Sequence, residues 1–295
     1  MEKISTEIAA GRRLVSDGAW GTLLQKKGLK PGECPELWCL THRADVLEIA
    51  RGYIAAGADM IKTNSFGGTA FKLDFYGLAE KAGEINKAAA AISREAAGQE
   101  KHVIASMGPT GKMLLMGDVT EDQLKQAFAA QAVALAQGGA DAVCIETMSD
   151  LAEARLAIGA VRENTDLEII CTFTFEKNAQ GKYRTMMGVS PSEMALACAE
   201  AGADIIGSNC GNGFEQMPAI AAEIRKAVPG KPLIINANAG MPFQRGGATV
   251  FPETPEMAAG FVPALMAAGA NIIGGCCGTT PEHIRAIARA VRDLG

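Results

Sequence analysis

Residues 202–210 read Gly-Ala-Asp-Ile-Ile-Gly-Ser-Asn-Cys, and the outline of this pattern recurs along the chain. Similar segments begin at residues 57, 139 and 269, each with Gly-Ala, then Asp or Asn, then an apolar run that ends in polar residues. A glycine that ends a helix, a short turn and a buried strand together explain this order of residue types. The copies therefore predict four strands, each preceded by a helix.

Four other apolar runs are strand candidates: the short run from Leu14 that ends at Asp17-Gly18, and the runs at His102–Met107, 168–175 and Leu233–Asn238. All eight runs alternate with helical stretches, such as the one expected from about Asp45 to Ala56. This alternation predicts an α/β fold with a single (β/α)8 barrel of the TIM type, and one domain over residues 1–295. A doubly wound sheet is the alternative, but the even distribution of the recurring units favours a closed barrel.

Composition narrows the function classes. The chain has 295 residues, a net charge of −5 and a pI near 5.4, and it has no basic cluster, so we expect no nucleic-acid surface. Residues 1–13 lack the apolar core of a signal peptide, and the apolar stretch 261–278 is interrupted by Asn271, so we expect no membrane span. Eight cysteines without a secretory signal favour metal binding or catalysis in a reducing cytoplasm.

Two adjacent cysteines, Cys276 and Cys277, follow the last apolar run and are framed by glycines. Catalytic side chains of such barrels lie at the C-terminal ends of the strands, where Cys210 also lies. Soft thiolates in this setting suit zinc, so we predict a three-cysteine zinc site with an open fourth position. A vicinal disulfide and plain core packing are the alternatives for the adjacent pair. Three other cysteines are expected to be core residues: Cys144, Cys171 and Cys198.

The strand ends also carry Asp17 and Glu146, which capping or turn formation could equally explain. The three histidines are expected at surface or capping positions, which disfavours a histidine-rich hydrolytic site. Gly274-Gly275 before a helix start resembles the anion-binding loop of phosphate-binding barrels, so a lyase or isomerase is a competing hypothesis. The absence of an obvious lysine or histidine at the strand ends weighs against it.

The polar strand ends resemble homocysteine S-methyltransferases, most closely the N-terminal homocysteine-binding module of cobalamin-dependent methionine synthase. The resemblance spans about residue 12 to the end of the chain. It rests on the following motifs: Asp17-Gly18-Ala19, Thr63-Asn64-Ser65-Phe66-Gly67-Gly68, Gly108-Pro109-Thr110-Gly111, Glu146-Thr147, Asn209-Cys210, Asn238-Ala239-Gly240 and Gly275-Cys276-Cys277-Gly278-Thr279-Thr280-Pro281.

The resemblance implies a zinc-dependent barrel enzyme that methylates homocysteine to methionine, with one zinc ion per chain bound by Cys210, Cys276 and Cys277. It assigns Asp17 and Glu146 to the amino group of homocysteine. It assigns the carboxylate to the backbone of two segments, Gly18-Ala19 and Ser65-Phe66-Gly67. Asn238 would occupy the fourth zinc position when substrate is absent. A non-catalytic binding subunit is a further alternative, disfavoured because all these residues are present.

Two departures from the family pattern bear on the substrates. No motif for corrinoid or folate is recognised, so we expect a separate methyl donor, a methylcorrinoid protein in preference to betaine or S-methylmethionine. The apolar segment 113–116, with Met186 and Met187, is expected to be either a lid or a docking surface for that protein. The glycine-rich stretch 211–213 replaces an expected serine-bearing form, so another small thiol remains an alternative acceptor.

Overall fold

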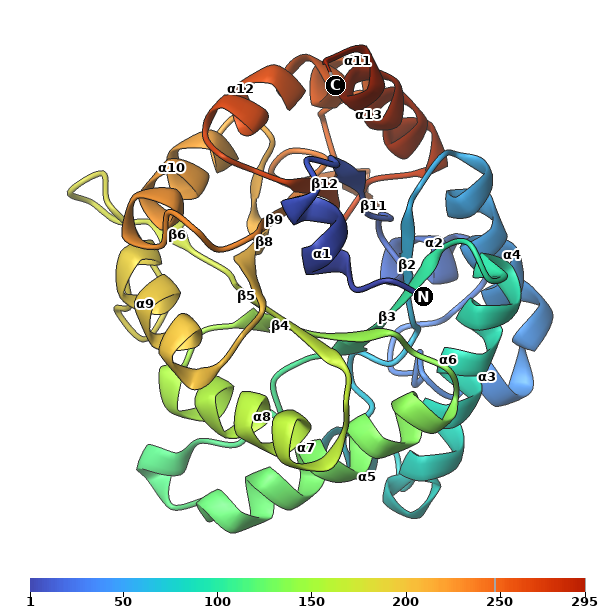
Figure 1. Ribbon diagram of the computed structural model, residues 1–295. Helices are drawn as coiled ribbons and strands as arrows, with labels where there is room; N and C mark the ends of the chain where they lie inside the picture. Colours follow the sequence, from blue (N-terminus) through green and yellow to red (C-terminus); the bar gives the residue numbers. More distant parts are fainter. Residues whose placement is uncertain (247, 295) are drawn as a thin grey trace.

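Eight parallel strands form the centre of the computed structural model, which describes residues 1–246 and 248–294 (Figure 1). Along the sheet β2 is followed by β3, β4, β5, β8, β9, β12 and β1. The strand bounds are Leu14–Val15 (β1), Met60–Lys62 (β2), His102–Met107 (β3), Ala142–Met148 (β4), Glu168–Phe173 (β5), Ile205–Gly213 (β8), Leu233–Asn238 (β9) and Ile272–Gly275 (β12). The predicted barrel of eight strands is confirmed.

Helices surround these strands on the outside (Figure 1). Capping boxes begin α7 and α9, where Thr120 and Ser190 each bond the residue three positions on. Within the described residues no helix has the length and apolar character needed to cross a membrane. The helix bounds are Ile4–Ala9 (α1), Gly21–Lys26 (α2), Trp38–Thr41 (α3), Arg43–Ala55 (α4), Ala70–Asp74 (α5), Ala82–Ala97 (α6), Glu121–Gln137 (α7), Leu151–Asn164 (α8), Pro191–Ala201 (α9), Met217–Ala227 (α10), Pro255–Gly260 (α11), Val262–Ala267 (α12) and Pro281–Leu294 (α13), with 3-10 turns Ala79–Lys81 (η1) and Leu114–Met116 (η2).

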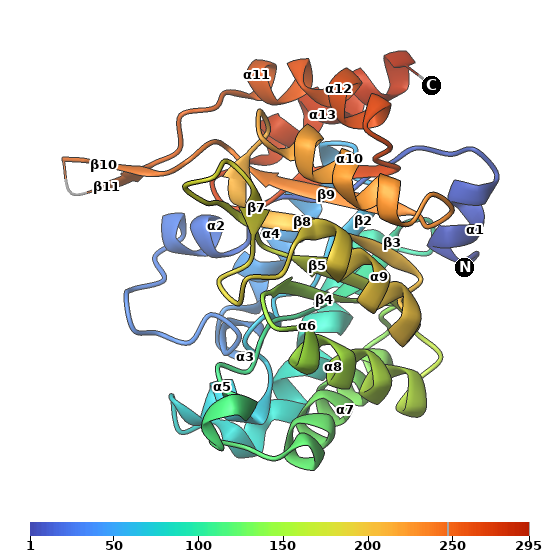
Figure 2. The ribbon, with the colours of Figure 1, turned by 90° about the vertical axis from the view of Figure 1, so that its left-hand side faces the viewer.

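The two ends of the barrel differ. Helix α1 covers the N-terminal end, where the Glu168 carboxylate accepts hydrogen bonds from the backbone N–H groups of Ile4 and Ser5 at 2.7 and 2.8 Å. The hairpin of β10 (Phe243–Arg245) and β11 (Ala248–Val250) projects from the opposite end (Figure 2). A second hairpin, β6 (Glu176–Lys177) with β7 (Tyr183–Arg184), follows β5. The C-terminal end is therefore left open for a site.

The recurring Gly-Ala-Asp pattern has a structural cause. Its glycines, at positions 57, 139, 202 and 269, all have φ between 96° and 101°, a left-handed conformation that suits glycine after a helix. The Asp or Asn that follows forms two hydrogen bonds with the adjacent strand that comes earlier in the chain. Asp141, for example, donates its N–H to the Val103 carbonyl at 2.9 Å and accepts the Val103 N–H on Oδ2 at 2.7 Å.

The same reciprocal pair joins the other strands that the pattern begins. Asp59 pairs with Val15, Asp204 with Ile169 and Asn271 with Leu233, with bonds of 2.8 to 3.0 Å. The Asp59 pair connects β2 to β1 and so closes the barrel between its first two strands. Each copy thus fixes the register of two adjacent strands at their N-terminal ends.

Three of the copies place a carboxylate against a cation, and one does not. Lys101, Arg94 and Arg162 pair with Asp59, Asp141 and Asp204, respectively. Arg225 instead donates to the neutral amide oxygen of Asn271 at 2.9 Å.

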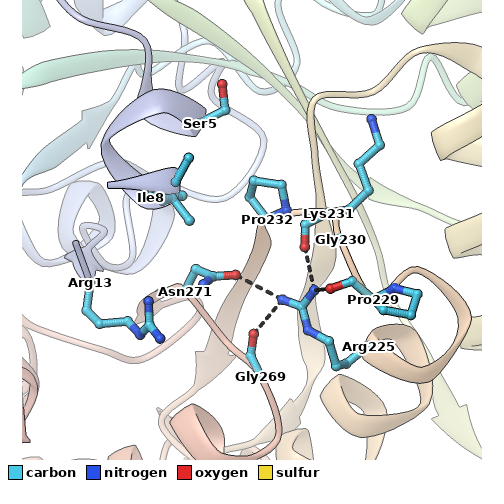
Figure 3. Close-up of a pocket in the computed structure, with 11 residues that line it drawn as sticks. Ser5, Ile8, Arg13, Arg225, Pro229, Gly230, Lys231, Pro232, Gly269 and Asn271 are labelled. Carbon is cyan, nitrogen blue, oxygen red and sulfur yellow. Dashed lines mark hydrogen bonds between the residues drawn. The ribbon is translucent and has the colours of Figure 1, made fainter. Parts of the chain in front are cut away.

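Arg225 lies in a pocket of about 470 Å³ at the N-terminal end of the barrel (Figure 3). Arg13 and Lys231 also line this pocket, and its described lining includes no carboxylate. Arg225 donates to the carbonyls of Pro229, Lys231 and Gly269, so its N–H groups are used to hold loops together (Figure 3).

We expect Asn271→Asp to stabilise the protein by up to about 1 kcal/mol, because it supplies Arg225 with the carboxylate found in the other copies. The new oxygen still accepts the Leu233 N–H. The gain should shrink in high salt, which screens the pair. Urea denaturation at low and high salt measures both effects. Asp204→Asn is the matched control with the opposite sign, and a destabilised Asn271→Asp protein would contradict the explanation.

Candidate metal centre and acceptor cavity

A cavity of about 390 Å³ lies at the end of the barrel where the strands finish. Its wall includes all three predicted metal ligands and most of the predicted substrate residues: Cys210, Cys276, Cys277, Gly18, Ala19, Ser65, Phe66 and Glu146. Asp17, Gly67 and Asn238 lie off the wall. Ser106 also lines it, and so do Glu36 and Lys62, which the sequence analysis missed.

The three cysteines form one cluster, as predicted. Their sulfur atoms all lie within 4.8 Å of one another, and those of Cys210 and Cys277 are 3.9 Å apart. Two thiolates on one tetrahedral zinc ion are about 3.8 Å apart, because each Zn–S bond is about 2.3 Å. The pair of strands β8 and β12, on either side of β9, therefore delivers thiols at the spacing that zinc requires.

Glycines let the backbone bring these sulfurs together. Cys210 itself has φ of 57°, rare for a residue with a side chain, and Gly211 follows with φ of 70°. A Cβ at Gly211 would lie 2.5 Å from Thr174 Oγ1. Beside the adjacent pair Cys276-Cys277, a Cβ at Gly274 would lie 2.6 Å from a side-chain atom of Ser16, and one at Gly278 would overlap Phe251. Close packing therefore requires glycine at positions 211, 274 and 278.

The electrostatics of the cluster favour a cation. Hydrogen bonds from the thiols of Cys276 and Cys277 lower the pKa of Cys210 to about 3. Those same bonds need the donor thiols protonated, so the pKa of Cys276 is raised to about 11 and the pKa of Cys277 is raised further. A thiolate at one cysteine thus disfavours thiolates at the other two. Three thiolates at this spacing need a bound positive charge.

Asn238 supplies a second sign of a ligand. Its side chain is buried, its amide lies within hydrogen-bond reach of Cys210, and its carbonyl oxygen has no partner among the described residues. A buried, unpaired amide oxygen costs free energy unless something satisfies it. Three clustered cysteine sulfurs beside a buried amide with an unpaired oxygen form a donor set that fits zinc.

Glu146 has a partner that the sequence analysis did not anticipate. Lys62 Nζ lies 2.8 Å from Glu146 Oε2, both side chains are buried, and Ser106 Oγ donates to Glu146 Oε1 at 2.5 Å. The expectation that no lysine lies at the strand ends is wrong, because Lys62 is the last residue of β2. A lysine after Met60 and Ile61 was the available signal. Burial acts to lower the pKa of Lys62, but the Glu146 carboxylate raises it above its ordinary value, so Lys62 stays an ammonium.

A strained residue orients Glu146. Thr147, the next residue, has φ of 61°, an outlier for a β-branched side chain. Asn209 holds this conformation: its Oδ1 accepts the Thr147 N–H at 2.8 Å, and its Nδ2 donates to Thr147 Oγ1 at 2.7 Å. Thr172 Oγ1 donates to the same Asn209 oxygen at 2.7 Å. The strand end is thereby turned so that Glu146 faces the cavity.

Asp17 lies behind the wall rather than on it. Its Oδ2 accepts the backbone N–H of Lys62 at 2.8 Å and the indole N–H of Trp20 at 2.9 Å. The side chain is fully buried, and this burial raises its pKa to about 6. Asp17 therefore holds β2 and the Trp20 loop in place.

Two of the backbone N–H groups expected to receive a carboxylate already have partners. Ala19 donates to Thr279 Oγ1 at 3.1 Å, and Gly67 donates to Glu36 Oε1 at 2.7 Å. Glu36 comes from the loop before α3, far from β2 in sequence, which is why no local pattern predicted it.

The remaining alternatives find little support in the geometry. In the Gly274-Gly275 loop, Gly275 and Cys276 donate their N–H groups to the carbonyls of Asp17 and Ala237, so these groups are not free for a phosphate. None of the three histidines is among the lining residues. His102 is buried against Glu7 of α1, so the expectation of a surface or capping position is wrong for it. Cys144, Cys171 and Cys198 are buried core residues, as predicted.

Apolar side chains are exposed on loops that follow the strand ends. They include Leu115 and Met116 after β3, Met186 after β5, and Met241 and Phe243 after β9. Leu114 is the member of the first loop that packs against the core. The β10–β11 hairpin marks this end of the barrel in Figure 2.

Comparisons with known proteins agree with this description. The sequence pattern of the family described as Homocysteine S-methyltransferase matches residues 14–291. Methionine synthases of Mycobacterium leprae (strain TN) and Mycobacterium tuberculosis (strain ATCC 25618 / H37Rv) are 34% and 32% identical to the chain and match 97% and 98% of it. The chain spans a quarter of the length of these relatives, 25% in each case.

The fold is also similar to a solved structure. The metallated form of the homocysteine methyltransferase MmuM from Escherichia coli matches with a TM-score of 0.78 and 21% identity, over 96% of this chain and 98% of that one. Its oxidized form matches with a TM-score of 0.77 and 22% identity, over 97% and 99%. At these identities the likeness shows the barrel fold.

The raised pKa of Asp17 gives a pH prediction. Its pKa is about 6 in the folded protein and 3.8 ordinarily, so between these values the folded chain keeps a proton that the unfolded chain releases. The stability that Asp17 contributes therefore falls as pH rises from about 4 to 7, by about 3 kcal/mol for two pKa units. Asp17→Asn removes the titration, so we expect the wild type to lose this amount relative to the variant. Urea denaturation across that pH range measures it.

A substitution at an exposed carboxylate controls for the negative charge that Asp17→Asn removes. Asp118→Asn should follow the wild type across the same pH range, because the Asp118 side chain lies in water. A stability difference between Asp17→Asn and the wild type that stays constant with pH would contradict the assignment.

Proposed function

The chain belongs to the homocysteine S-methyltransferase family, and we propose that its three-cysteine centre binds zinc and activates the thiol of homocysteine for methylation. The observation that carries this proposal is the cluster of Cys210, Cys276 and Cys277, with sulfurs within 4.8 Å of one another on the cavity wall. The unpaired oxygen of Asn238 beside the cluster supports it.

A bound zinc ion would act by lowering the pKa of the substrate thiol. A free thiol with a pKa near 8.5 is mostly protonated at neutral pH, and a bound zinc ion lowers that pKa so that the thiolate, the nucleophile, is present. The chain contributes no histidine to the wall to act as a base. Cys210, Cys276 and Cys277 would hold the ion, and the strand-end glycines keep their sulfurs at the required spacing.

The methyl transfer itself needs position more than acid–base chemistry. The sulfur of homocysteine attacks the methyl carbon, an S–C bond forms, and the bond between methyl group and donor breaks with its electron pair left on the donor. The thiol proton is released to solvent. The cavity walls at Phe66, Gly18 and Ala19 enclose the carbon chain and exclude water from the reacting sulfur.

The substrate residues keep the roles that the family resemblance implies, as part of the proposal. We assign Glu146, which pairs with Lys62 on the wall, to the amino group, and Asp17 holds the backbone of Lys62 from behind. We assign the carboxylate of homocysteine to the segments Gly18-Ala19 and Ser65-Phe66-Gly67. Asn238 would fill the fourth ligand position when no thiol is bound.

A methylcorrinoid protein is the proposed methyl donor. The resemblance to the cobalamin-dependent methionine synthase module favours it over betaine or S-methylmethionine. The exposed apolar side chains of Leu115, Met116 and Met186 at the open end of the barrel support a protein partner, since water contact of such groups is unfavourable. We assign this activity to a reducing compartment, the cytoplasm, because the three ligand cysteines must stay free thiols, as they are here.

Zinc content tests the metal assignment. We expect about one zinc ion per chain in the wild type, and loss of nearly all of it in Cys277→Ser, because a hydroxyl is a far poorer zinc ligand than a thiolate. Elemental analysis of untagged protein purified without oxygen measures this. Cys198→Ser, a buried cysteine outside the cluster, is the control and should keep its zinc. Full zinc retention by Cys277→Ser would refute the ligand set.

The donor is tested with three methyl sources on the zinc-loaded protein. We expect methionine to form from homocysteine with methylcobalamin, the free form of the corrinoid group, and not with betaine or S-methylmethionine. Mass spectrometry of the thioether product measures it. Turnover with betaine or S-methylmethionine, and none with methylcobalamin, would replace the proposed donor with a small molecule while leaving the thiol-activating site intact.

A further inference from the structure

Strand β4 ends in a bulge that carries Glu146. It pairs with β5 at Ile145 and again at Met148, opposite positions 171 and 173. Two residues of β4, Glu146 and Thr147, therefore lie opposite a single residue of β5, and Thr147 has φ of 61°. A bulge of this kind redirects a side chain at the end of a strand. Here it redirects the carboxylate that we assign to the amino group of homocysteine.

Strand β8 ends in a second bulge, which carries the first of the three clustered cysteines. It pairs with β9 at Asn209 and again at Gly213, opposite positions 236 and 238. Three residues of β8 therefore lie opposite one residue of β9, and Cys210, with φ of 57°, is one of them. Asn212 in the same bulge donates its side-chain N–H to the Phe175 carbonyl at 2.7 Å. This bulge thus has an anchor of its own.

The buried side chain of Asn209 joins the two bulges. Its Oδ1 accepts the Thr147 N–H at 2.8 Å, and its Nδ2 donates to Thr147 Oγ1 at 2.7 Å. The same Nδ2 lies 3.5 Å from Glu146 Oε2 and 3.9 Å from Cys276 Sγ. Because Asn209 also precedes Cys210 in the chain, one residue connects the amino-group subsite to two of the proposed metal ligands.

Thr147 depends on these hydrogen bonds for its conformation. A left-handed φ is unfavourable for a β-branched residue, because its side chain crowds the backbone. Glycine adopts the same φ without that cost. Loss of the Asn209 side chain therefore releases the bulge at Thr147, whereas Thr147→Gly removes the strain that this side chain has to hold.

We propose that Asn209 is a positioning residue for recognition of the acceptor's amino group. By holding Thr147 in its left-handed conformation, it fixes the Glu146 carboxylate relative to the metal centre. A carboxylate has about four acceptor positions, and Lys62 and Ser106 take one on each oxygen, so positions remain for an amino group. This inference rests on the proposed thiol-methylating function and adds a residue that determines selectivity for an amino-bearing thiol.

Two thiols separate amino-group recognition from the other contacts: homocysteine, and 4-mercaptobutyrate, which lacks only the amino group. Calorimetric titration of zinc-loaded protein gives their dissociation constants. We expect Asn209→Ala to weaken homocysteine binding by at least about tenfold, and to change 4-mercaptobutyrate binding by less than about threefold. Elemental analysis should show that the variant keeps its zinc, because Asn212 still anchors the Cys210 bulge.

Thr147→Gly, introduced into the Asn209→Ala protein, tests how Asn209 acts. We expect the double variant to recover homocysteine binding by at least about threefold, because the bulge then no longer needs the two hydrogen bonds. Asn164→Ala is the matched control: it removes a carboxamide at the end of α8, where Nδ2 donates to the Ala160 carbonyl at 2.8 Å. It should bind both thiols as the wild type does.

The outcomes separate the inference from the proposed function. Unchanged homocysteine affinity in Asn209→Ala, an equal loss for both thiols, loss of zinc, or no recovery in the double variant would overturn the inference. If Asn209→Ala does not fold, Thr172→Val removes the hydrogen bond that Thr172 Oγ1 donates to Asn209 Oδ1, and unchanged homocysteine affinity there would overturn it. Failure of the zinc-loaded wild type to bind either thiol would instead overturn the proposed function.

Discussion

The reciprocal hydrogen-bond pair between an Asp or Asn and the neighbouring strand is the interaction on which this barrel depends. At Asp59, Asp141, Asp204 and Asn271 it binds two strands at their starts, and the Asp59 pair joins the first strand to the second. A parallel barrel has no hairpins to fix register locally. Because the strand starts are fixed, the C-terminal ends of the strands also have fixed positions relative to one another. The polar residues at these ends therefore surround one cavity.

The metal centre depends on this strand register and on the glycines next to Cys210 and next to Cys276-Cys277. Strands β8 and β12 lie on either side of β9, so their ends are near neighbours, but ordinary backbone would not bring three sulfurs within 4.8 Å. The left-handed turn at Cys210 and Gly211 directs one sulfur toward the others, and the close packing of Gly274 and Gly278 lets the adjacent pair approach from β12. Mutual hydrogen bonding among the thiols then leaves a cluster that favours a cation.

Sequence reasoning reached the barrel and the cysteine cluster because both rest on strong local patterns. Buried parallel strands are continuous apolar runs, and adjacent cysteines between glycines are rare outside special sites. It missed Lys62 and Glu36 for different reasons. Lys62 reads as the edge of an apolar strand, and only the barrel geometry shows that its side chain reaches Glu146 across β3. Glu36 acts from an irregular loop, whose path no periodicity predicts.

The buried Lys62 also offsets negative charge at the three-cysteine centre. Three thiolates outweigh the two positive charges of one zinc ion, and a bound substrate thiolate adds another negative charge. The Lys62 ammonium acts to lower the pKa of Cys276, although the hydrogen bond to Cys210 dominates there. An isolated Glu146 would oppose the thiolates, whereas the Lys62–Glu146 pair is neutral overall and presents a positive end within the cavity. The ion pair therefore reduces the repulsion that Glu146 would exert on negative charge at the sulfurs.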